Sequence, residues 1–393
     1  MESIKDKAAI VGMGCTKFGE RWDKSATDLM VDAAYEAYED ASLGPADVQA
    51  AWLSTYYSGI TGQMLAEALK LTYIPVTRIE NACASASDAL RNACYAVISG
   101  ACDIALVLGV EKLKDNGYSG LPDSEWWVRR DNTYRDQSMT APGRYALMAT
   151  RYFFHYGLQR AEGKTLLAQI AVKNHYNGSL HPKAHFQQKI TLEQAVNAPL
   201  IAWPLGLFDC CGVSDGASAA MVTRSDLAKR FRPDPVYVKA LQISTGPREG
   251  FMNPAYDWAH VEETTRAAAA AYKQAGLANP RREISLIELH DCFSITELVT
   301  YEDLQLSPRG KAREDVESGF FSLQGQLPVN SDGGLTCFGH PIGASGLRMM
   351  YEVYKQLQGK AGPRQVNNPR LGLTHNLGGT PGSATASVII AGL

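Results

Sequence analysis

The stretch that decides the fold is NACASASD, residues 81–88, in which small side chains surround Cys83. An apolar, strand-like segment precedes it at residues 74–80, and a helical pattern follows from Ala89 to Ile98. A thiol at the first turn of a helix lies near unpaired N–H groups and the positive end of the helix dipole, and both favour the reactive thiolate. We therefore predict that Cys83 is a nucleophile rather than a cysteine packed in a tight turn.

Two internal echoes indicate two similar halves. AYEDASL at residues 37–43 is echoed by AYKQAGL at 271–277, and each ends a helical pattern ahead of an apolar strand. SDALR at 87–91 is matched by SGLR at 345–348, and each begins a helix that leads to a strand, at 103–109 and 371–375 respectively. The alternation of strands and helices predicts an α/β fold. The continuous apolar run at 103–109 predicts a strand in a covered parallel sheet.

Between the halves the pattern loosens, and we expect an insertion with short helices that shapes a binding site. The predicted first half covers residues 1–114 and 200–235 and carries Cys83. The inserted loop domain covers 115–199. The second half covers 236–393 and carries His290, Cys292 and His340.

The motif GHPIGASG, residues 339–346, puts His340 directly before a helix of the second half, at the place equivalent to Cys83 in the first. If the halves pack about a pseudo-twofold axis, the two helix starts converge. His340 could then act as a base toward Cys83 or donate to a substrate oxygen.

Two more motifs end strands of the second half. HDCF, residues 290–293, follows the strand at 284–289, at the sheet edge where open parallel sheets place ligands. Its Asp291 could orient a neighbour or cap a helix. HNLGGTPG, residues 375–382, follows the strand at 371–374 and reads as a glycine-rich turn whose N–H groups could bind an oxyanion.

The bulk composition narrows the class of protein. The chain has 393 residues, of which 45% are hydrophobic and 20% charged, as in a globular protein of about two or three domain-sized units. The formal net charge of -3 gives no reason to expect nucleic-acid binding. We find no apolar run that would span a bilayer and no secretory signal, so a cytoplasmic protein is expected. The 8 cysteines form no CxxC pair, which argues against a metal site.

Together the four motifs resemble the thiolase superfamily over essentially the whole chain. The likeness points to the branch of the sterol carrier protein 2 thiolase domain and archaeal acetyl-CoA acetyltransferases. HDCF, GHPIGASG and HNLGG are specific marks of that branch. The resemblance implies an α/β fold of five layers, αβαβα, made of two similar halves with a loop domain inserted in the first.

The resemblance also implies roles for single residues. Cys83 is acylated, and His340 activates it and helps to bind the thioester oxygen. Cys292 is the acid/base at the α-carbon, and His290 contributes to the oxyanion site of the enolate. Backbone N–H groups of Cys83 and Gly379 form a second oxyanion hole.

The chain departs from better-known thiolases at Asn376. Those enzymes carry their second catalytic cysteine in a C-terminal CxG motif, where this chain has Asn376, so the acid/base role moves to Cys292. Asn376 and Asp291 are expected to support the site. Trp126 and Trp127, with Tyr118, could line a bulky or aromatic pocket or simply pack within the insertion.

The implied reaction is cleavage of a 3-oxoacyl-CoA by coenzyme A through acyl-Cys83, or the reverse condensation. Coenzyme A is then a co-substrate, and no bound cofactor is expected. The acyl group stays open between acetoacetyl-CoA and a benzoylsuccinyl-type ester. Alternatives are a decarboxylating condensing enzyme, a thiolase-like aldolase, and a non-catalytic acyl-CoA-binding subunit. The resemblance implies a homodimer or a complex with a small OB-fold protein that carries a zinc ribbon.

Overall fold

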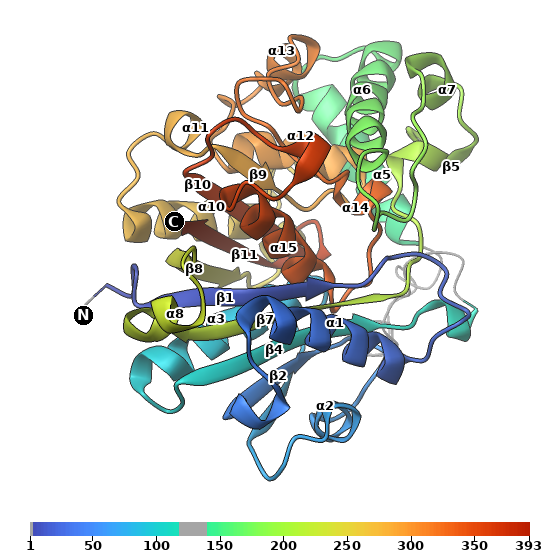
Figure 1. Ribbon diagram of the computed structural model, residues 1–393. Coiled ribbons are helices and arrows are strands. Elements are labelled where there is room, and N and C mark those ends of the chain that lie inside the picture. The colour runs from blue at the N-terminus through green and yellow to red at the C-terminus, as the bar shows by residue number, and fades with distance from the viewer. Residues whose placement is uncertain (1–2, 118–139) are drawn as a thin grey trace.

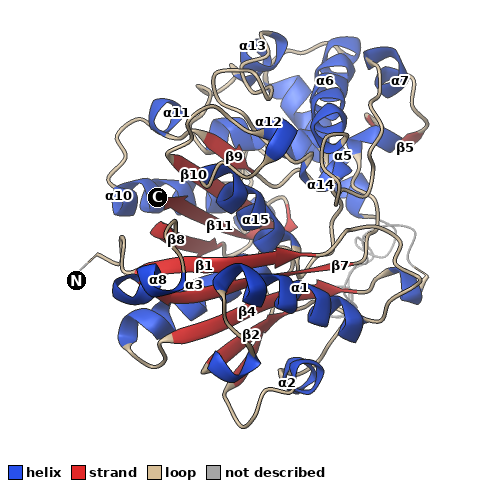
Figure 2. Ribbon diagram, viewed as in Figure 1, coloured by secondary structure: helices blue, strands red, loops and turns tan. Residues whose placement is uncertain are grey.

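The structure is a computed structural model that describes residues 3–117 and 140–393 (Figure 1). Strands and helices alternate along the described chain, as the predicted α/β class requires (Figure 2). Trp126, Trp127 and Tyr118 lie outside the described residues.

The first half of the chain builds a mixed sheet. Its strands are β1 (Ala8–Cys15), β2 (Ala50–Ser54), β3 (Val76–Ile79), β4 (Ile104–Glu111) and β7 (Gly216–Arg224). They lie in the order β3-β2-β4-β7-β1. β2 pairs in parallel with β3 and β4, whereas β7 is antiparallel to both β4 and β1. The parallel surroundings predicted for residues 103–109 are therefore correct on one side of β4 and wrong on the other.

The second half repeats this order in reverse. Its strands are β8 (Val236–Thr245), β9 (Leu286–Glu288), β10 (Leu371–Thr380) and β11 (Ser383–Gly392). They continue the sheet as β8-β11-β10-β9, so that β8 matches β1, β11 matches β7, β10 matches β4 and β9 matches β2. A short antiparallel contact between β1 and β8 joins the halves. A parallel bridge from Ile287 to Val329 stands where β2 pairs with β3 in the first half.

β10 corrects one prediction. The residues expected to form a turn at 375–382 continue the strand to Thr380, and ten pairs join β10 to β11 in register. Only Pro381 and Gly382 remain as the turn between the two strands. Strand β11 is the antiparallel partner, and it hydrogen-bonds the backbone groups that were expected to be free in a loop.

The helices belong to the same two halves. Those of the first half are α1 (Ala26–Ala41), α2 (Gln63–Leu69), α3 (Ser85–Ser99) and α8 (Ser225–Phe231), with 3-10 turns at Pro45–Asp47 and Lys114–Asn116. Those of the second half are α9 (Glu249–Met252), α10 (Glu262–Ala275), α11 (Pro280–Glu283), α12 (Ser294–Asp303), α13 (Ala312–Glu317), α14 (Gly334–Cys337) and α15 (Ser345–Leu357), with a 3-10 turn at Gly362–Arg364. The echoed segments fall on α1 and α10, and on α3 and α15.

The packing produces five layers. α1 covers the outer face of β1 and β7, and α10 covers the outer face of β8 and β11. α3 and α15 touch each other and contact strands of both halves, so they form the middle layer (Figure 1). Three large clusters of buried apolar side chains fill the spaces between these layers. The predicted αβαβα fold is confirmed.

The middle layer depends on small side chains at the starts of its helices. A Cβ atom on Gly346 of α15 would lie 2.5 Å from Ser87 Oγ and 2.9 Å from the Ser87 backbone nitrogen of α3. Real Cβ atoms do not come this close to such atoms, so only glycine allows the approach. The contact brings together the loops that precede α3 and α15, and these loops carry Cys83 and His340.

The insertion is more helical than predicted. It contains α5 (Ala141–His155), α6 (Arg160–Gly178), α7 (Leu192–Val196), β5 (Leu200–Ala202), β6 (Leu205–Gly206) and a 3-10 turn at Leu207–Asp209. With 15 and 19 residues, α5 and α6 are not the short helices expected. β5 and the turn at 207–209 contact these helices, which favours an insertion that continues past the predicted boundary at 199. Among the described residues, every helix is too short or too polar to cross a bilayer.

Candidate active site

Cys83 lies in a tight turn between β3 and α3. Ala82 takes a left-handed conformation with φ 47°, which turns the chain sharply just before the cysteine. Ser85 holds this turn, because its Oγ accepts a hydrogen bond from Asn81 N at 2.7 Å and donates to Ala82 O at 2.5 Å. α3 begins at Ser85, so Cys83 stands two residues before the helix rather than in its first turn.

The loop of His340 is held by strands of the opposite half. Ser54 Oγ donates to Gly343 O at 2.7 Å, and Ser218 Oγ donates to Ala344 O at 2.6 Å. The loop also lies directly on Gly109 of β4, where a Cβ atom would come within 2.1 Å of Gly343 O. Strands β2, β4 and β7 of the first half therefore set the position of a histidine that belongs to the second.

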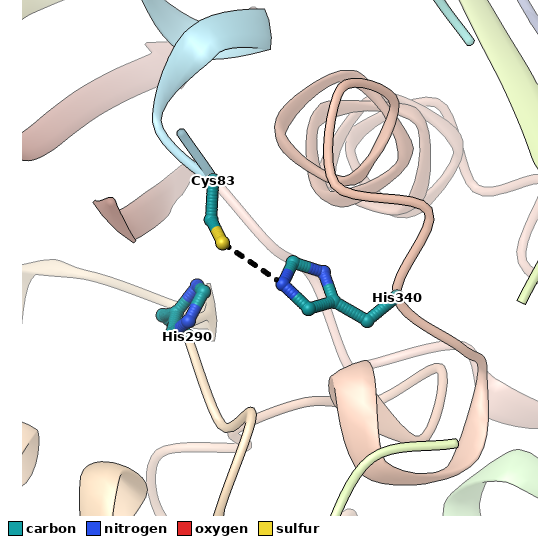
Figure 3. A group of neighbouring side chains, drawn as sticks. All are labelled: Cys83, His290 and His340. Atoms are coloured by element: carbon teal, nitrogen blue, oxygen red, sulfur yellow. Dashed lines mark hydrogen bonds between the residues drawn. The ribbon is translucent and has the colours of Figure 1, made fainter. Parts of the chain in front are cut away.

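The side chains of Cys83 and His340 meet across the two halves (Figure 3). His340 Nε2 lies 3.1 Å from Cys83 Sγ, and His340 Nδ1 lies 2.7 Å from Ser345 Oγ. Ser345 donates its own hydrogen to Pro341 O at 2.9 Å, so its oxygen accepts from Nδ1–H. The proton of neutral His340 is thereby placed on Nδ1, and the lone pair of Nε2 faces the thiol. This tautomer can accept the proton of Cys83.

The interior keeps this pair neutral. Burial, with a smaller contribution from nearby Arg348, lowers the pKa of His340 to about 3. Burial raises the pKa of the Cys83 thiol well above its usual value, and neighbouring Cys292 and Glu111 act in the same direction. The helix dipole opposes these effects, but it contributes only about 1 kcal/mol. The direction of both pKa shifts is opposite to the resting thiolate predicted from the helix dipole.

The ring of His290, which also belongs to the second half, lies beside Cys83 and His340 (Figure 3). Its ring is T-shaped to that of His340 with centroids 5.3 Å apart. Among the described residues, neither ring nitrogen of this buried histidine has a hydrogen-bond partner. Burial lowers its pKa well below the usual value, so the ring is neutral and keeps one N–H to offer. An unsatisfied buried donor of this kind is suited to a ligand oxygen.

Cys292 joins the group from the end of HDCF. It is buried, and its Sγ lies 3.7 Å from Thr296 Oγ1. Burial raises its pKa to about 12, while hydrogen bonding from Thr296 and Tyr145 acts in the opposite direction. A charge on Cys292 would raise the pKa of Cys83 further. The structure thus brings together Cys83, His290 and His340, with Cys292 two residues after His290 in the chain.

Asp291 and Asn376, which were expected to support the site, bond to residues that hold its loops and helices in place. The Asp291 carboxylate accepts hydrogen bonds from Thr336 Oγ1 at 2.7 Å and Asn174 Nδ2 at 2.9 Å, and it ties HDCF to α14 and α6. Asn376 Oδ1 accepts from Ser87 Oγ at 2.6 Å, beside Gly346, where α3 and α15 meet. Within the described residues, Asn376 has no hydrogen bond to Cys83 or His340.

Gly379 lies beside the cysteine turn. A Cβ atom on the preceding Gly378 would come within 2.1 Å of Asn81 O, so β10 packs directly against that turn. Gly379 itself has φ 108°, a conformation that favours glycine. Its predicted N–H role in an oxyanion hole stays a prediction. A cavity of about 450 Å³ opens next to it, lined by residues that include Asn81, Ala82 and Arg248.

The donors of the site also bear on metal binding. One nitrogen of His290, one of His340 and the sulfur of Cys83 all lie within 4.8 Å of one another. Thiolate and neutral imidazole are ligands that Zn²⁺ accepts. These are the same groups that the predicted chemistry requires, so a metal there would block them rather than assist them.

The sequence analysis did not predict two residues near the site, Tyr145 and Glu111. Tyr145 enters from α5, where the loosened pattern of the insertion gives no signal for it. Glu111 ends β4, and its carboxylate accepts from Gly343 N at 3.2 Å and Tyr57 N at 3.2 Å. A charged residue at the end of a buried strand is itself a signal, because such a carboxylate must find partners in the interior.

Comparisons with known proteins identify the family of the chain. The sequence profile described as "Thiolase, N-terminal domain" matches residues 8–226, and that described as "Thiolase C-terminal domain-like" matches 250–391. The acetyl-CoA acetyltransferase of Methanothermobacter thermautotrophicus is 38% identical over 391 residues, with 97% of this chain and 98% of the relative covered. The chain therefore belongs to the thiolase family, and it is an acyltransferase of the thiolase type. The resemblance seen in the sequence is confirmed.

Two further similarities matter for the substrate. Benzoylsuccinyl-CoA thiolase subunit BbsB of Thauera aromatica is 30% identical over 381 residues, with 96% of both chains covered. A solved structure described as "Ltp2-ChsH2(DUF35) aldolase" superposes with a TM-score of 0.86 at 25% identity, and covers 100% of this chain and 99% of that one. Thiolases and an aldolase thus share this architecture.

The neutral pair predicts how Cys83 responds to pH. Because the pKa of the thiol is raised and that of His340 is lowered, the thiolate fraction should rise steadily with pH. We expect the rate of alkylation of Cys83 by iodoacetamide to increase from pH 6 to 9 without a low-pH plateau, read by mass spectrometry of the Cys83 peptide (~tenfold per pH unit below the pKa). A plateau that extends down to about pH 5 would instead reveal a thiolate–imidazolium pair.

Proposed function

We propose that the chain is a thiolase that cleaves a 3-oxoacyl-CoA with coenzyme A, or runs the reverse condensation, through an acyl group on Cys83. The observation that carries this proposal is the 3.1 Å contact between His340 Nε2 and Cys83 Sγ. Beside it lies the ring of His290, which has no hydrogen-bond partner within residues 3–117 and 140–393. A soft nucleophile, a base and an adjacent donor are the parts that carbon–carbon cleavage at a thioester requires.

Cleavage begins with acylation. His340 accepts the proton of Cys83 on Nε2, and the thiolate adds to the 3-oxo carbonyl carbon. The carbonyl oxygen becomes an oxyanion, which the backbone N–H groups of Cys83 and Gly379 stabilise. Preorganised donors of this kind typically contribute about 10²–10³ in rate each.

Carbon–carbon cleavage follows. The electron pair of the broken bond passes into the enolate of the departing thioester, whose oxygen accepts hydrogen bonds from His290 and His340. Cys292 gives its proton to the α-carbon, which leaves a free acyl-CoA and a Cys292 thiolate. Coenzyme A then enters, gives its thiol proton to the Cys292 thiolate, and attacks the acyl group on Cys83. The Cys83 thiolate leaves and takes back the proton that His340 holds. This order predicts ping-pong kinetics.

Two classes of acyl group are proposed. A short 3-oxoacyl-CoA is supported by the likeness to the archaeal acetyl-CoA acetyltransferase. A bulky aromatic ester is supported by the likeness to BbsB, whose name refers to benzoylsuccinyl-CoA. The cavity beside Gly379 is lined by Arg248 and Glu80 and reaches the cysteine turn, which suits it to the arm of coenzyme A.

Two other chemistries on this fold have an observation in their favour. The close grouping of Cys83, His290 and His340 is the Cys-His-His set of a decarboxylating condensing enzyme, which would not need Cys292. The superposition on an aldolase supports carbon–carbon cleavage without acyl transfer. Cys83, hydrogen-bonded to His340, favours the thiolase, because an aldolase has no use for an acylated cysteine. A non-catalytic acyl-CoA-binding subunit remains the alternative from another class.

Turnover of a substrate panel tests the proposal. The wild-type chain should cleave at least one of short, long and aryl 3-oxoacyl-CoAs, and acid quenching should trap the acyl group on the Cys83 peptide. Cys83→Ser should abolish the adduct. Cys292→Ala should lower cleavage by about 10²–10⁴-fold, since it removes the acid/base at the α-carbon.

The other readings have distinct signatures in the same panel. Full turnover by Cys292→Ala would contradict the thiolase mechanism and favour the decarboxylating enzyme. Cleavage without an adduct would favour the aldolase. No turnover and no adduct with any acyl-CoA would leave the binding subunit.

We also propose that the chain works as a homodimer or with a small OB-fold, zinc-ribbon partner. Support comes from the DUF35 component named in the superposed aldolase and from the word "subunit" in the name of BbsB. Light scattering of the chain purified alone should give a dimer if the first form is active. Full activity of that dimer would exclude a required partner, whereas activity restored only by an added OB-fold protein would establish one.

A further inference from the structure

Tyr145 carries the insertion into the centre of the site. It lies on α5 and is 3% exposed, and its ring packs against Phe293 with centroids 4.6 Å apart. Phe293 directly follows Cys292, so this ring contact fixes the tyrosine against HDCF. No motif and no predicted role included it.

The hydroxyl of Tyr145 has two possible acceptors. It donates to Gly379 O at 3.2 Å. Its ring contact with Phe293 also places Tyr145 beside Cys292, the preceding residue, and Tyr145 lowers the pKa of that thiol against the effect of burial. A hydroxyl has one hydrogen to donate, so the two acceptors compete for it.

The charge on Cys292 decides which acceptor wins. While Cys292 is a thiol, its sulfur is a weak acceptor and the carbonyl of Gly379 holds the hydrogen. When Cys292 becomes a thiolate, a charge-assisted hydrogen bond is about twice as strong as a neutral one. The hydroxyl can then turn to the sulfur by rotation about a single bond, without movement of the backbone.

We propose that Tyr145 is a positioning residue that stabilises the thiolate form of Cys292 and, between those steps, fixes the Gly379 peptide beside Cys83. The inference rests on the proposed thiolase function. In the condensation direction, the Cys292 thiolate takes a proton from the α-carbon of an acyl-CoA. The C–H bond breaks, an S–H bond forms, and the electron pair moves into the enolate. Tyr145 donates a hydrogen bond throughout and transfers no proton.

Two exchange reactions separate this role from a structural one. Exchange of α-protons of acetyl-CoA with deuterated water reports on Cys292, whereas exchange of isotopically labelled CoA into acetyl-CoA reports on acylation of Cys83. In Tyr145→Phe, α-proton exchange should fall by about 10²-fold. Labelled-CoA exchange should fall by less than about tenfold, because the contact between Cys83 and His340 is retained. The rising limb of the α-proton exchange rate should move to higher pH, since Cys292 loses a donor to its thiolate.

A matched control lies on the same helix. Tyr152 is buried in α5, and its hydroxyl donates to Glu302 at 2.7 Å rather than into the site. Tyr152→Phe should leave the pH dependence of α-proton exchange where it is in the wild-type protein, and thermal unfolding of both variants shows whether the fold is kept.

The outcomes are distinguishable. Equal losses in both exchanges, or an unshifted pH limb, in a folded Tyr145→Phe would overturn the inference and leave the proposed function intact. Absence of both exchanges from the wild-type protein, with acetyl-CoA and with every acyl-CoA of the substrate panel, would overturn the proposed function and the inference with it.

Discussion

The starts of α3 and α15 touch at Ser87 and Gly346, and the candidate active site depends on that contact. A side chain at position 346 would collide with the Ser87 backbone, which would push the two helices apart. Asn376 hydrogen-bonds Ser87 at the same place. Because Cys83 and His340 stand in the loops just before these helices, a shift of about 1 Å here would break a 3.1 Å contact between them. Asn376 thus has a structural task where the two halves meet.

The charge states of the site residues depend on how deeply the two halves bury them. Burial keeps Cys83, Cys292, His290 and His340 uncharged in the free protein. A neutral site attracts metal ions less strongly than a charged one would. The orientation of His340 is fixed in advance by Ser345, so no reorganisation is needed at the moment of proton transfer.

The sequence predicted the parts that repeat or alternate. The two echoes located α1, α3, α10 and α15, and small residues around Cys83 and His340 marked the two turns that meet. The predictions that failed concern features that depend on residues distant in the chain. β10 extends past residue 374 because β11 pairs with it, and no local pattern at the glycines contains that information. The protonation of Cys83 depends on burial by both halves, which outweighs the local helix dipole.

In the insertion, too, the sequence did not predict features that depend on distant contacts. Its loose pattern concealed two long helices, and the contact from Tyr145 to Gly379 spans 234 positions of sequence. Contacts of that separation arise only when the whole fold is assembled. The sequence motifs therefore predicted Cys83, His290 and His340. They did not predict Tyr145, which connects the insertion to these residues.

The central claim is that His340, supplied by the second half, makes Cys83 of the first half reactive. The most direct test is the rate of Cys83 acylation by an accepted acyl-CoA in His340→Asn, measured by rapid quenching and mass spectrometry. His175→Asn is the control, because His175 is a buried histidine on α6 whose Nδ1 lies 3.2 Å from Gln188 O, and it is not part of the group formed by Cys83, His290 and His340. The account predicts a loss of at least about 10²-fold in His340→Asn, with the control much less affected. Acylation of His340→Asn at the wild-type rate would contradict it.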